Sequence, residues 1–437
     1  MTGRAGGARA TTVVRDAVWG DIELEPALTD ALATPELQRL RWIRQLGTAH
    51  LVYPSANHTR FEHGLGACHV AGRMLAALAA RGATVTPEQA RVARAAALVH
   101  DVGHVPFGHT FEDERRLFPR HDRPERTRRF VGPGTALGQA LEAHGLLAPV
   151  LAALGAGAAD APGDALVTDL VSGTVCADLL DYLARDAHGT GIRRGYDERV
   201  LRYLDVRDGR LVLCLTKRGL PREDAFSEVV HLLRLRYTLS ERVYFHHAKV
   251  ASGALVSKLV ERAVARGLVL EDLFELGDEG LLLHLRHAYA PGDPVVARLL
   301  DDLRARRLPK RAWVLGRGDV TADQQAALVA RFHADRAARE AFEAELEAAC
   351  GLEPGDVVLY CPGADMALKE AHMLADVGPG PLRPLASLRL PEVDLLLEKH
   401  RDLWRLYVFL AARRVDARDA VAHAAAERLG VRGAQPS

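Results

Sequence analysis

Hydrophobic and polar positions follow different periods along the chain. Residues 11–26 alternate Val, Ile and Leu with polar residues, are interrupted at Gly20 and stop before a proline, which predicts a strand-and-turn entry. From there to about residue 265 helical spacing dominates. Thr86-Pro87-Glu88-Gln89 is a typical helix start, and the small apolar residues 90–99 that follow it indicate a buried central helix.

Beyond about residue 305 the pattern changes to that of a mixed α/β region. Apolar runs typical of strands alternate here with two helical stretches. The runs are residues 312–315, 357–361 and 406–410, and the helical stretches are residues 321–349 and 415–429. The sequence therefore predicts a mainly α protein with three parts: an N-terminal strand/turn entry (residues 1–26), a helical catalytic core (residues 27–305) and a smaller C-terminal α+β domain (residues 306–437).

Composition is that of an ordinary globular protein with no strong signal for nucleic acid. Of 437 residues, 48% are hydrophobic and 26% are charged, so the chain can bury a sizeable core. Lys and Arg together number 57, as do Asp and Glu, so the formal net charge is zero. No general cationic field attracts polyanions or membranes, and any group that binds phosphate must act locally.

The cysteines and the apolar runs bear on localisation. The five cysteines are odd in number and form no C-x-x-C pair, which argues against a disulfide framework and against a thiolate zinc site. The first residues lack the apolar run of a signal peptide, and no stretch of about 18 apolar residues occurs. We therefore expect a cytoplasmic protein without a membrane partner.

Four residues form a candidate metal site: His63, the adjacent pair His100-Asp101 and Asp178. Asp101 follows directly on the apolar helix, and burying a carboxylate without a partner costs several kcal/mol. A cation removes that cost. Two imidazoles and two carboxylates suit one divalent Mn, Mg, Fe, Co, Ni or Zn ion. A single histidine among the 19 of this chain is more often a surface or core residue, so the helix context of the pair is what favours the metal.

A second cluster follows the pair and contains His104, His109, Glu112 and His121. Gly103, Pro106 and Gly108 punctuate this stretch, so we expect a tight loop beside the metal. Imidazole titrates near neutral pH and can transfer a proton to a leaving oxygen. A purely structural loop is the alternative.

Two polar stripes have helical spacing. They consist of Asp178, Asp181, Tyr182, Arg185 and Asp186 in one stretch and of Arg236, Ser240 and Tyr244 in another. Two such stripes can line a cleft that binds phosphate and sugar. On spacing alone, however, solvated helix faces are the more common explanation.

Several runs of this sequence resemble the HD-domain superfamily, and within it the deoxynucleoside triphosphate triphosphohydrolases. The similarity covers about residues 12–265. The runs are Gln38-Arg39-Leu40-Arg41-Trp42-Ile43-Arg44-Gln45-Leu46-Gly47, Tyr53-Pro54-Ser55-Ala56-Asn57-His58-Thr59-Arg60-Phe61-Glu62-His63-Gly64-Leu65-Gly66, His100-Asp101-Val102-Gly103-His104-Val105-Pro106-Phe107-Gly108-His109, Asp181-Tyr182-Leu183-Ala184-Arg185-Asp186 and Val243-Tyr244-Phe245-His246-His247. An isolated His-Asp pair is a weak signal, whereas ordered blocks make a chance resemblance improbable.

The resemblance implies an HD-domain core that hydrolyses a deoxynucleoside triphosphate at its α-phosphate to nucleoside and tripolyphosphate, in a homo-oligomer. It implies one divalent metal ion held by His63, His100, Asp101 and Asp178. His109 would donate a proton with support from Glu112 and His121, and His104 would lie on the phosphate side. The substrate would be bound by Arg60 and Arg236 at the phosphates and by Gln45, Leu46, Tyr182, Asp186 and Tyr244 around the sugar.

Some positions depart from the vertebrate pattern of this branch. Leu179 stands where a basic residue is found and Ser240 where a histidine is found, so the triphosphate would be bound differently. At the positions of a guanine-nucleotide activator site, Ala33 replaces an acidic residue and Thr12 replaces a lysine, so we expect no tight activation by GTP.

Three other functions stay open. The first is hydrolysis of another nucleotide or phosphate ester by an HD phosphohydrolase, the second is an HD-fold oxygenase with two irons, and the third is a nucleotide-binding regulator without catalysis. The oxygenase requires further histidine ligands, for which His104 or His121 would serve. The regulator is disfavoured because every expected metal ligand is present.

Overall fold

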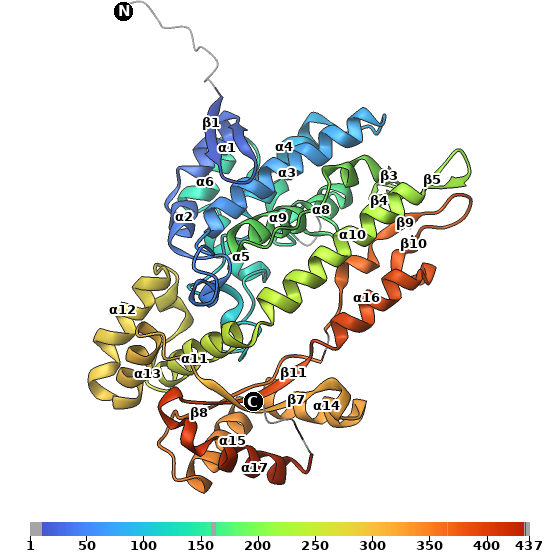
Figure 1. Cartoon of the computed structure of the whole chain (residues 1–437). Coiled ribbons are helices and arrows are strands. Elements are labelled where there is room, and N and C mark those ends of the chain that lie inside the picture. The colour runs from blue at the N-terminus through green and yellow to red at the C-terminus, as the bar shows by residue number, and fades with distance from the viewer. Residues whose placement is uncertain (1–10, 159–162, 365, 432, 434–437) are drawn as a thin grey trace, which may run out of the picture.

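The computed structural model describes residues 11–158, 163–364, 366–431 and 433 (Figure 1). The first ten residues of the predicted entry, and residues 365, 432 and 434–437 of the predicted C-terminal domain, therefore lie outside the described part. The entry itself is an antiparallel hairpin of β1 (Thr12–Asp16) and β2 (Gly20–Leu24). Gly20 has a positive φ of 75° at its turn, a conformation that glycine adopts without a steric cost.

Helices α3, α4 and α9 form the centre of the helical core. α4 (Pro87–Val99) begins at the expected place, because Thr86 and Gln89 form a capping box and Pro87 occupies the first turn. It packs against the long helix α3 (Arg60–Ala80), which in turn packs against α9 (Ala177–Thr190). Every residue of α4 from Ala95 to Val99 is buried, as its apolar run predicts.

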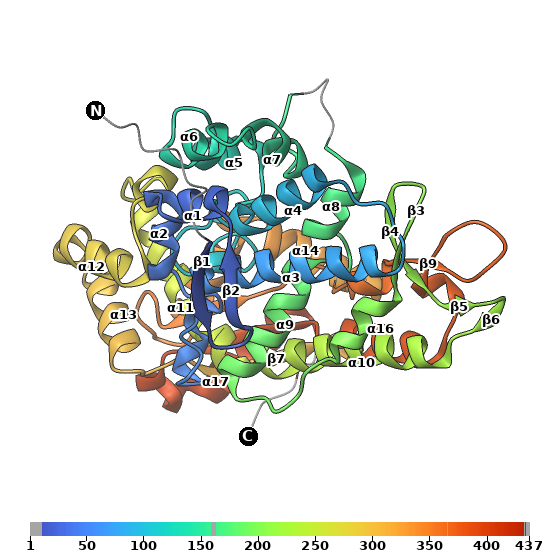
Figure 2. The same ribbon diagram turned by 90° about the horizontal axis from the view of Figure 1, so that it is seen from above.

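Shorter helices surround this centre. Figure 2 shows α5, α6 and α7 together beside α4, on the side away from α10. These surrounding helices are α1 (Pro26–Leu32), α2 (Pro35–Gln38), α5 (Pro124–Val131), α6 (Ala136–Glu142), α7 (Leu147–Ala153) and α8 (Ala165–Ser172).

Two long helices connect the core to the rest of the molecule. α10 (Glu223–Leu239) passes through a π-helical turn, residues 240–244, and α11 (His247–Val264) follows. Arg236 and Tyr244 stay neighbours across this turn, since the guanidinium carbon of Arg236 lies 5.1 Å from the centroid of the Tyr244 ring. α12 (Asp278–Ala288) and α13 (Pro294–Arg304) complete this part.

The apolar runs after residue 305 form strands of a small antiparallel sheet. Its order is β7-β11-β8, with β7 at Lys310–Gly316, β8 at Val357–Tyr360 and β11 at Arg405–Leu410. α14 (Ala322–Val329), α15 (Arg336–Ala349) and α17 (Arg418–Leu429) lie around this sheet (Figure 1).

A second sheet joins distant parts of the chain. Its order is β10-β9-β4-β3, and β9 (Leu374–Asp376) runs parallel to β4 (Arg210–Cys214). β3 (Leu204–Arg207) and β10 (Arg383–Pro384) are its edges, and β5 (Thr216–Lys217) pairs with β6 (Leu220–Pro221) in a separate hairpin. Residues after 365 thus return to the helical core, where α16 (Pro391–Arg401) packs on α10.

The buried side chains confirm a mainly α fold with small sheets. The largest hydrophobic cluster spans the helical core and also takes in Leu368, Met373 and Leu396. A second cluster lies around the β7-β11-β8 sheet. Residues after 305 contribute to both clusters, so the clusters do not separate at this position. The domain boundary near residue 305 therefore stays a prediction. In the described part of the chain, no helix has the length and apolar character needed to cross a bilayer.

Candidate metal and phosphate site

The four predicted metal ligands come from three helix ends that meet at one place. His63 lies in the first turn of α3, which begins at a capping box of Thr59 and Glu62. His100 and Asp101 follow the last residue of α4, and Asp178 is in the first turn of α9. Because α3 packs between α4 and α9, these ends bring the side chains together.

The ligand atoms lie within reach of one ion. The Nε2 atoms of His63 and His100 are 3.3 Å apart, and Asp178 Oδ1 is 3.1 Å from His63 Nε2 and 3.5 Å from His100 Nε2. Asp101 is adjacent, with Oδ2 at 3.7 Å from His63 Nε2 and Oδ1 at 3.5 Å from His100 Nε2.

The hydrogen bonds behind the two histidines fit a cation between them. Asp181 Oδ2 lies 2.7 Å from His63 Nδ1, and the carbonyl oxygen of Ala97 lies 2.8 Å from His100 Nδ1. With an ion bound, each Nδ1 would keep its proton for this hydrogen bond, and each Nε2 would offer its lone pair to the ion. Both Nε2 atoms and Asp178 Oδ1 lie close to one another, so these residues fit a divalent ion.

The carboxylates of the group favour a positive charge at this place, which is either a proton on His63 or a bound cation. Burial alone would lower the pKa of His63, but hydrogen bonds to Asp178 and Asp181 outweigh it and raise that pKa to about 10. For Asp101, burial alone would raise the pKa, yet His100 and the guanidinium of Arg60 hold it well below its usual range.

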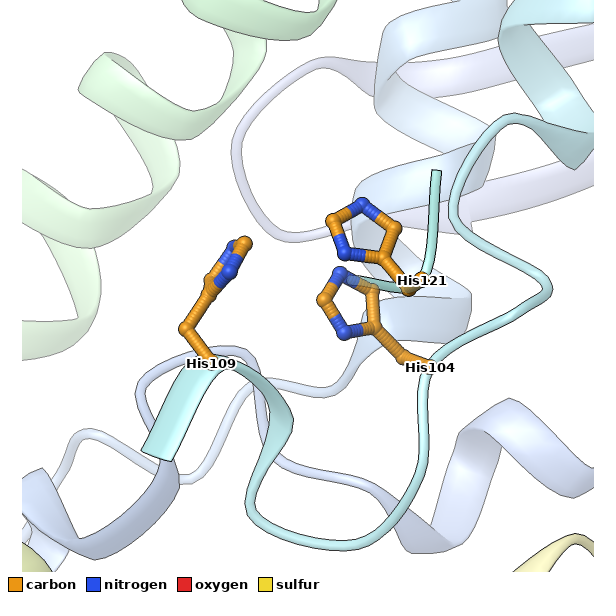
Figure 3. Close-up of side chains that lie close together, drawn as sticks. All are labelled: His104, His109 and His121. Carbon is orange, nitrogen blue, oxygen red and sulfur yellow. The ribbon is translucent and has the colours of Figure 1, made fainter. Parts of the chain in front are cut away.

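The second cluster is a group of three imidazoles on the loop after α4. The rings of His104 and His121 stack with their centroids 3.5 Å apart, and His109 faces them from the short 3₁₀ turn at residues 108–110 (Figure 3). Nitrogen atoms of the three rings lie within 4.8 Å of one another, so the group can hold an ion of its own. His104 is fully buried, and burial, Arg60 and His121 lower its pKa far below the ordinary value, so it is neutral at pH 7.

Two carboxylates hold these histidines. Glu112 accepts from His121 Nδ1 at 2.8 Å and from Arg126 at 3.0 Å, whereas it is 3.7 Å from His109. Asp113 is closer to His109, with 3.2 Å between Oδ2 and Nδ1. Glu112 thus supports His121, and Asp113 supports His109.

The loop that carries the histidines is held from two sides. Phe107 has a positive φ of 61°, which is uncommon for a bulky residue, and its N–H donates to the buried carboxylate of Asp278 at 2.7 Å. Arg39 donates to the carbonyl oxygens of Val102 and His104, both at 2.8 Å.

A cavity of about 780 Å³ lies against the metal ligands. Its wall includes His100, Asp101, Asp178, His109 and His121 together with the predicted phosphate residues Arg60 and Arg236. His63, His104 and Glu112 lie buried and do not line it.

A second cavity of about 530 Å³ shares some of these lining residues. The predicted sugar residues Gln45, Leu46, Tyr182, Asp186 and Tyr244 all line it. Asp186 is already bonded there, since its two oxygens contact His58 Nε2 at 2.9 Å and the Tyr244 hydroxyl at 2.6 Å. The structure therefore brings all the predicted site residues to one region, and their roles stay predictions.

Several residues at this region did not appear among the predicted site residues. Asp181 belongs to a run that marks the resemblance, and Asp113 follows His109 at helical spacing, so both had a local signal. Glu370 and His400 had none, because they lie more than 130 residues from their partners Arg236 and Ser240. His400 Nε2 is 3.1 Å from Ser240 Oγ, so an imidazole from α16 lies beside the serine that stands where a histidine was expected.

Comparisons with known proteins agree with this geometry. A family model described as HD domain matches residues 60–136, and one described as HD associated region matches residues 197–437. A phosphohydrolase from Bacteroides thetaiotaomicron shares the fold, with a TM-score of 0.70 and 23% identity over 92% of this chain and 99% of that one.

Two curated relatives match over about half of the present chain. Protein YwfO of Bacillus subtilis is 32% identical over 238 residues, which are 54% of this chain and 51% of the relative. The human deoxynucleoside triphosphate triphosphohydrolase SAMHD1 is 29% identical over 269 residues, which are 54% of this chain and 42% of the relative. The chain thus spans about half the length of these relatives, or less.

Proposed function

Because the chain belongs to the family of HD-domain phosphohydrolases with an HD-associated region, we propose that it hydrolyses deoxynucleoside triphosphates to nucleoside and tripolyphosphate. One observation carries the proposal: the imidazoles of His63 and His100 and the carboxylate of Asp178 converge on one point, with Asp101 adjacent, beside a cavity that Arg60 and Arg236 also line. The similarity to a triphosphohydrolase supports the substrate class.

His63, His100, Asp101 and Asp178 would hold the divalent ion. When bound, such an ion supplies Lewis-acid chemistry beside a phosphate and favours the deprotonation of water. The buried carboxylate of Asp181 orients the imidazole of His63, and that of Asp101 orients the guanidinium of Arg60.

The remaining steps fall to residues of the chain. Water attacks the α-phosphorus, the bond from phosphorus to the 5′ oxygen breaks, and His109 gives its proton to that oxygen. Asp113 contacts Nδ1 of His109 at 3.2 Å, so Nε2 of the same ring stays available to transfer the proton. Arg60 has two buried N–H donors, at Nε and Nη2, that find no partner among the described residues, and these suit a phosphate oxygen of the substrate.

The experiment that tests the proposal is a product analysis. The purified protein is incubated with each dNTP and with Mn, Mg or Co, and nucleoside, tripolyphosphate, pyrophosphate and phosphate are separated. We expect nucleoside and tripolyphosphate in equal amounts. Release of pyrophosphate or phosphate with a nucleotide product would instead assign another phosphohydrolase reaction.

The group of His104, His109 and His121 favours a second candidate, the oxygenase with two irons. Asp101 Oδ1 lies 3.4 Å from His104 Nε2 and 3.6 Å from His121 Nε2, so its carboxylate lies between the two groups of ligands. Metal analysis and a measurement of oxygen uptake together distinguish the two candidates. Two irons per chain and consumption of O₂ would favour the oxygenase.

A further inference from the structure

A carboxylate from the C-terminal region faces the phosphate side of the cavity. Glu370 lies in the 3₁₀ turn Lys369–His372, is only 6% exposed, and lines the same cavity as His100 and Asp101. Its Oε1 accepts from Arg236 Nε at 3.0 Å and lies 3.5 Å from the Tyr182 hydroxyl. A negative charge therefore lies beside Arg236, a residue that we expect to bind the phosphates.

Arg236 is neutralised by this contact. Its Nη1 donates to Ser240 Oγ at 2.8 Å, so two edges of the guanidinium are bonded within the protein. The other Glu370 oxygen, Oε2, is buried and has no hydrogen-bond partner in the described part of the chain. An incompletely bonded carboxylate raises the cost of bringing a second anion near, because no donor absorbs its charge.

The other arginines of the cavity are paired in the same way. Arg60 is bonded to Asp101, Arg120 to Asp122 and Arg210 to Asp169. Lys369 is the lining cation with no acidic partner among the residues that the structure describes. The arginines of the cavity thus offer little uncompensated positive charge beyond that of a bound divalent ion, although a triphosphate carries several negative charges.

We infer that Glu370 determines how much negative charge the cavity accepts, because it neutralises Arg236 and opposes the outer phosphates of a substrate. This inference rests on the proposed function, because it assumes that the phosphates of the substrate bind beside Arg236 in this cavity. Substrates with few phosphates then bind with little penalty, and triphosphates bind more weakly than the number of arginines suggests.

The test measures binding of inorganic tripolyphosphate and of orthophosphate to the manganese-loaded full chain by calorimetry. Glu370→Gln keeps the shape and removes the charge, so tripolyphosphate should bind roughly tenfold tighter or more, while orthophosphate changes little. Glu370→Asp keeps the charge and should not tighten binding. Glu398→Gln is the matched control, because Glu398 is also paired with an arginine, Arg317, but lies exposed and outside the cavity.

Unchanged or weaker tripolyphosphate binding in a folded Glu370→Gln protein would overturn the inference, as would equal tightening in Glu370→Asp. If Glu370→Gln does not fold, Glu370→Ala provides the same comparison. The measurement needs no turnover. A chain that hydrolyses no dNTP therefore refutes the proposed function, while the binding comparison still decides on Glu370.

Discussion

At the scale of single residues, the candidate metal site depends on which nitrogen of each histidine is free. Asp181 and the Ala97 carbonyl occupy the Nδ1 atoms of His63 and His100, so both Nε2 atoms face one point. Such partners of a ligand fix its orientation and its tautomer. The sequence predicted that these four residues share one metal site, because they lie in ordered motifs, and their role as ligands stays a prediction. The distances between them depend on how three helices pack, which no local pattern indicates.

Replacing His100 with alanine should remove the metal without disrupting the fold. The imidazole supplies one of four ligands and is not part of the hydrophobic core, so bound metal should fall and turnover should drop by roughly 100-fold or more. Metal analysis and the dNTP assay check both. His231→Ala, an exposed histidine of α10, is the control. Full metal content in the His100 variant would contradict the ligand assignment.

Arg60 should require its guanidinium and not only its charge. Nη1 is bonded to Asp101, while Nε and Nη2 have no partner in the part of the chain that the structure describes, and a lysine cannot supply this fork. We expect kcat/KM of Arg60→Lys to fall roughly 10- to 100-fold with metal content retained. Arg73→Lys in the same helix, whose partner Glu198 is exposed, is the control. A wild-type rate for Arg60→Lys would show that the fork does not bind substrate.

At the scale of elements, the first residue of α12 holds the loop that carries the histidines. Asp278 accepts from the N–H groups of Phe107 and Arg44, at 2.7 and 3.0 Å, and it is 1% exposed. Burial, which outweighs these hydrogen bonds, raises its pKa to about 6. This contact joins residues 171 positions apart, so no local pattern could predict it, whereas the cap and the end of α4 follow from adjacent residues.

The raised pKa of Asp278 predicts a pH dependence of stability. Between its unfolded pKa near 4 and its folded pKa near 6, the folded chain holds a proton that the unfolded chain has lost, so stability falls as pH rises through this window. A shift of about two units corresponds to about 3 kcal/mol. Asp278→Asn cannot ionise and should lack this fall. Urea unfolding of both proteins from pH 4 to pH 7, with a chelator present, measures it, and parallel pH profiles would contradict the assignment.

At the scale of the whole molecule, Thr12 and Ala33 lie at the positions that the family resemblance assigns to a nucleotide activator, outside the cavity. Thr12 lacks the amine and Ala33 lacks the carboxylate that a guanine-nucleotide site would need. The nearby Arg41 is bonded within the protein, since its Nε donates to Gln38 Oε1 at 2.8 Å. A lost charge-assisted hydrogen bond costs about 1.5–3 kcal/mol. Adding GTP to a dNTP assay should therefore change the rate little, and a rise of about tenfold or more would refute this expectation.

The C-terminal region is joined to the loop that carries the histidines by a buried network of charges. Arg115, three residues after Glu112, is 1% exposed and donates to Glu343 of α15 at 2.9 Å, to the Leu359 carbonyl of β8 at 2.9 Å, and to Glu261 of α11. The sequence predicted one helical stretch at residues 321–349, which the structure divides into α14 and α15, and an apolar run at residues 357–361, where β8 lies. It could not indicate that α15 and β8 hold residues 112–121, because charged residues 228 positions apart leave no local signal.

Removing one charge of this network should loosen the loop that carries Glu112 and His121. Glu343 Oε1 also accepts from the Leu359 N–H at 2.8 Å, so Glu343→Ala leaves several buried donors unpaired. Breaking a buried ion pair in this way costs about 3–5 kcal/mol. Denaturant unfolding should show that loss, and kcat should also fall at a temperature where the variant is folded and retains its metal. Glu353→Gln, an exposed partner of Arg298 in the same region, should change neither quantity. An unchanged kcat in folded Glu343→Ala would show that the network stabilises the fold without positioning the histidines.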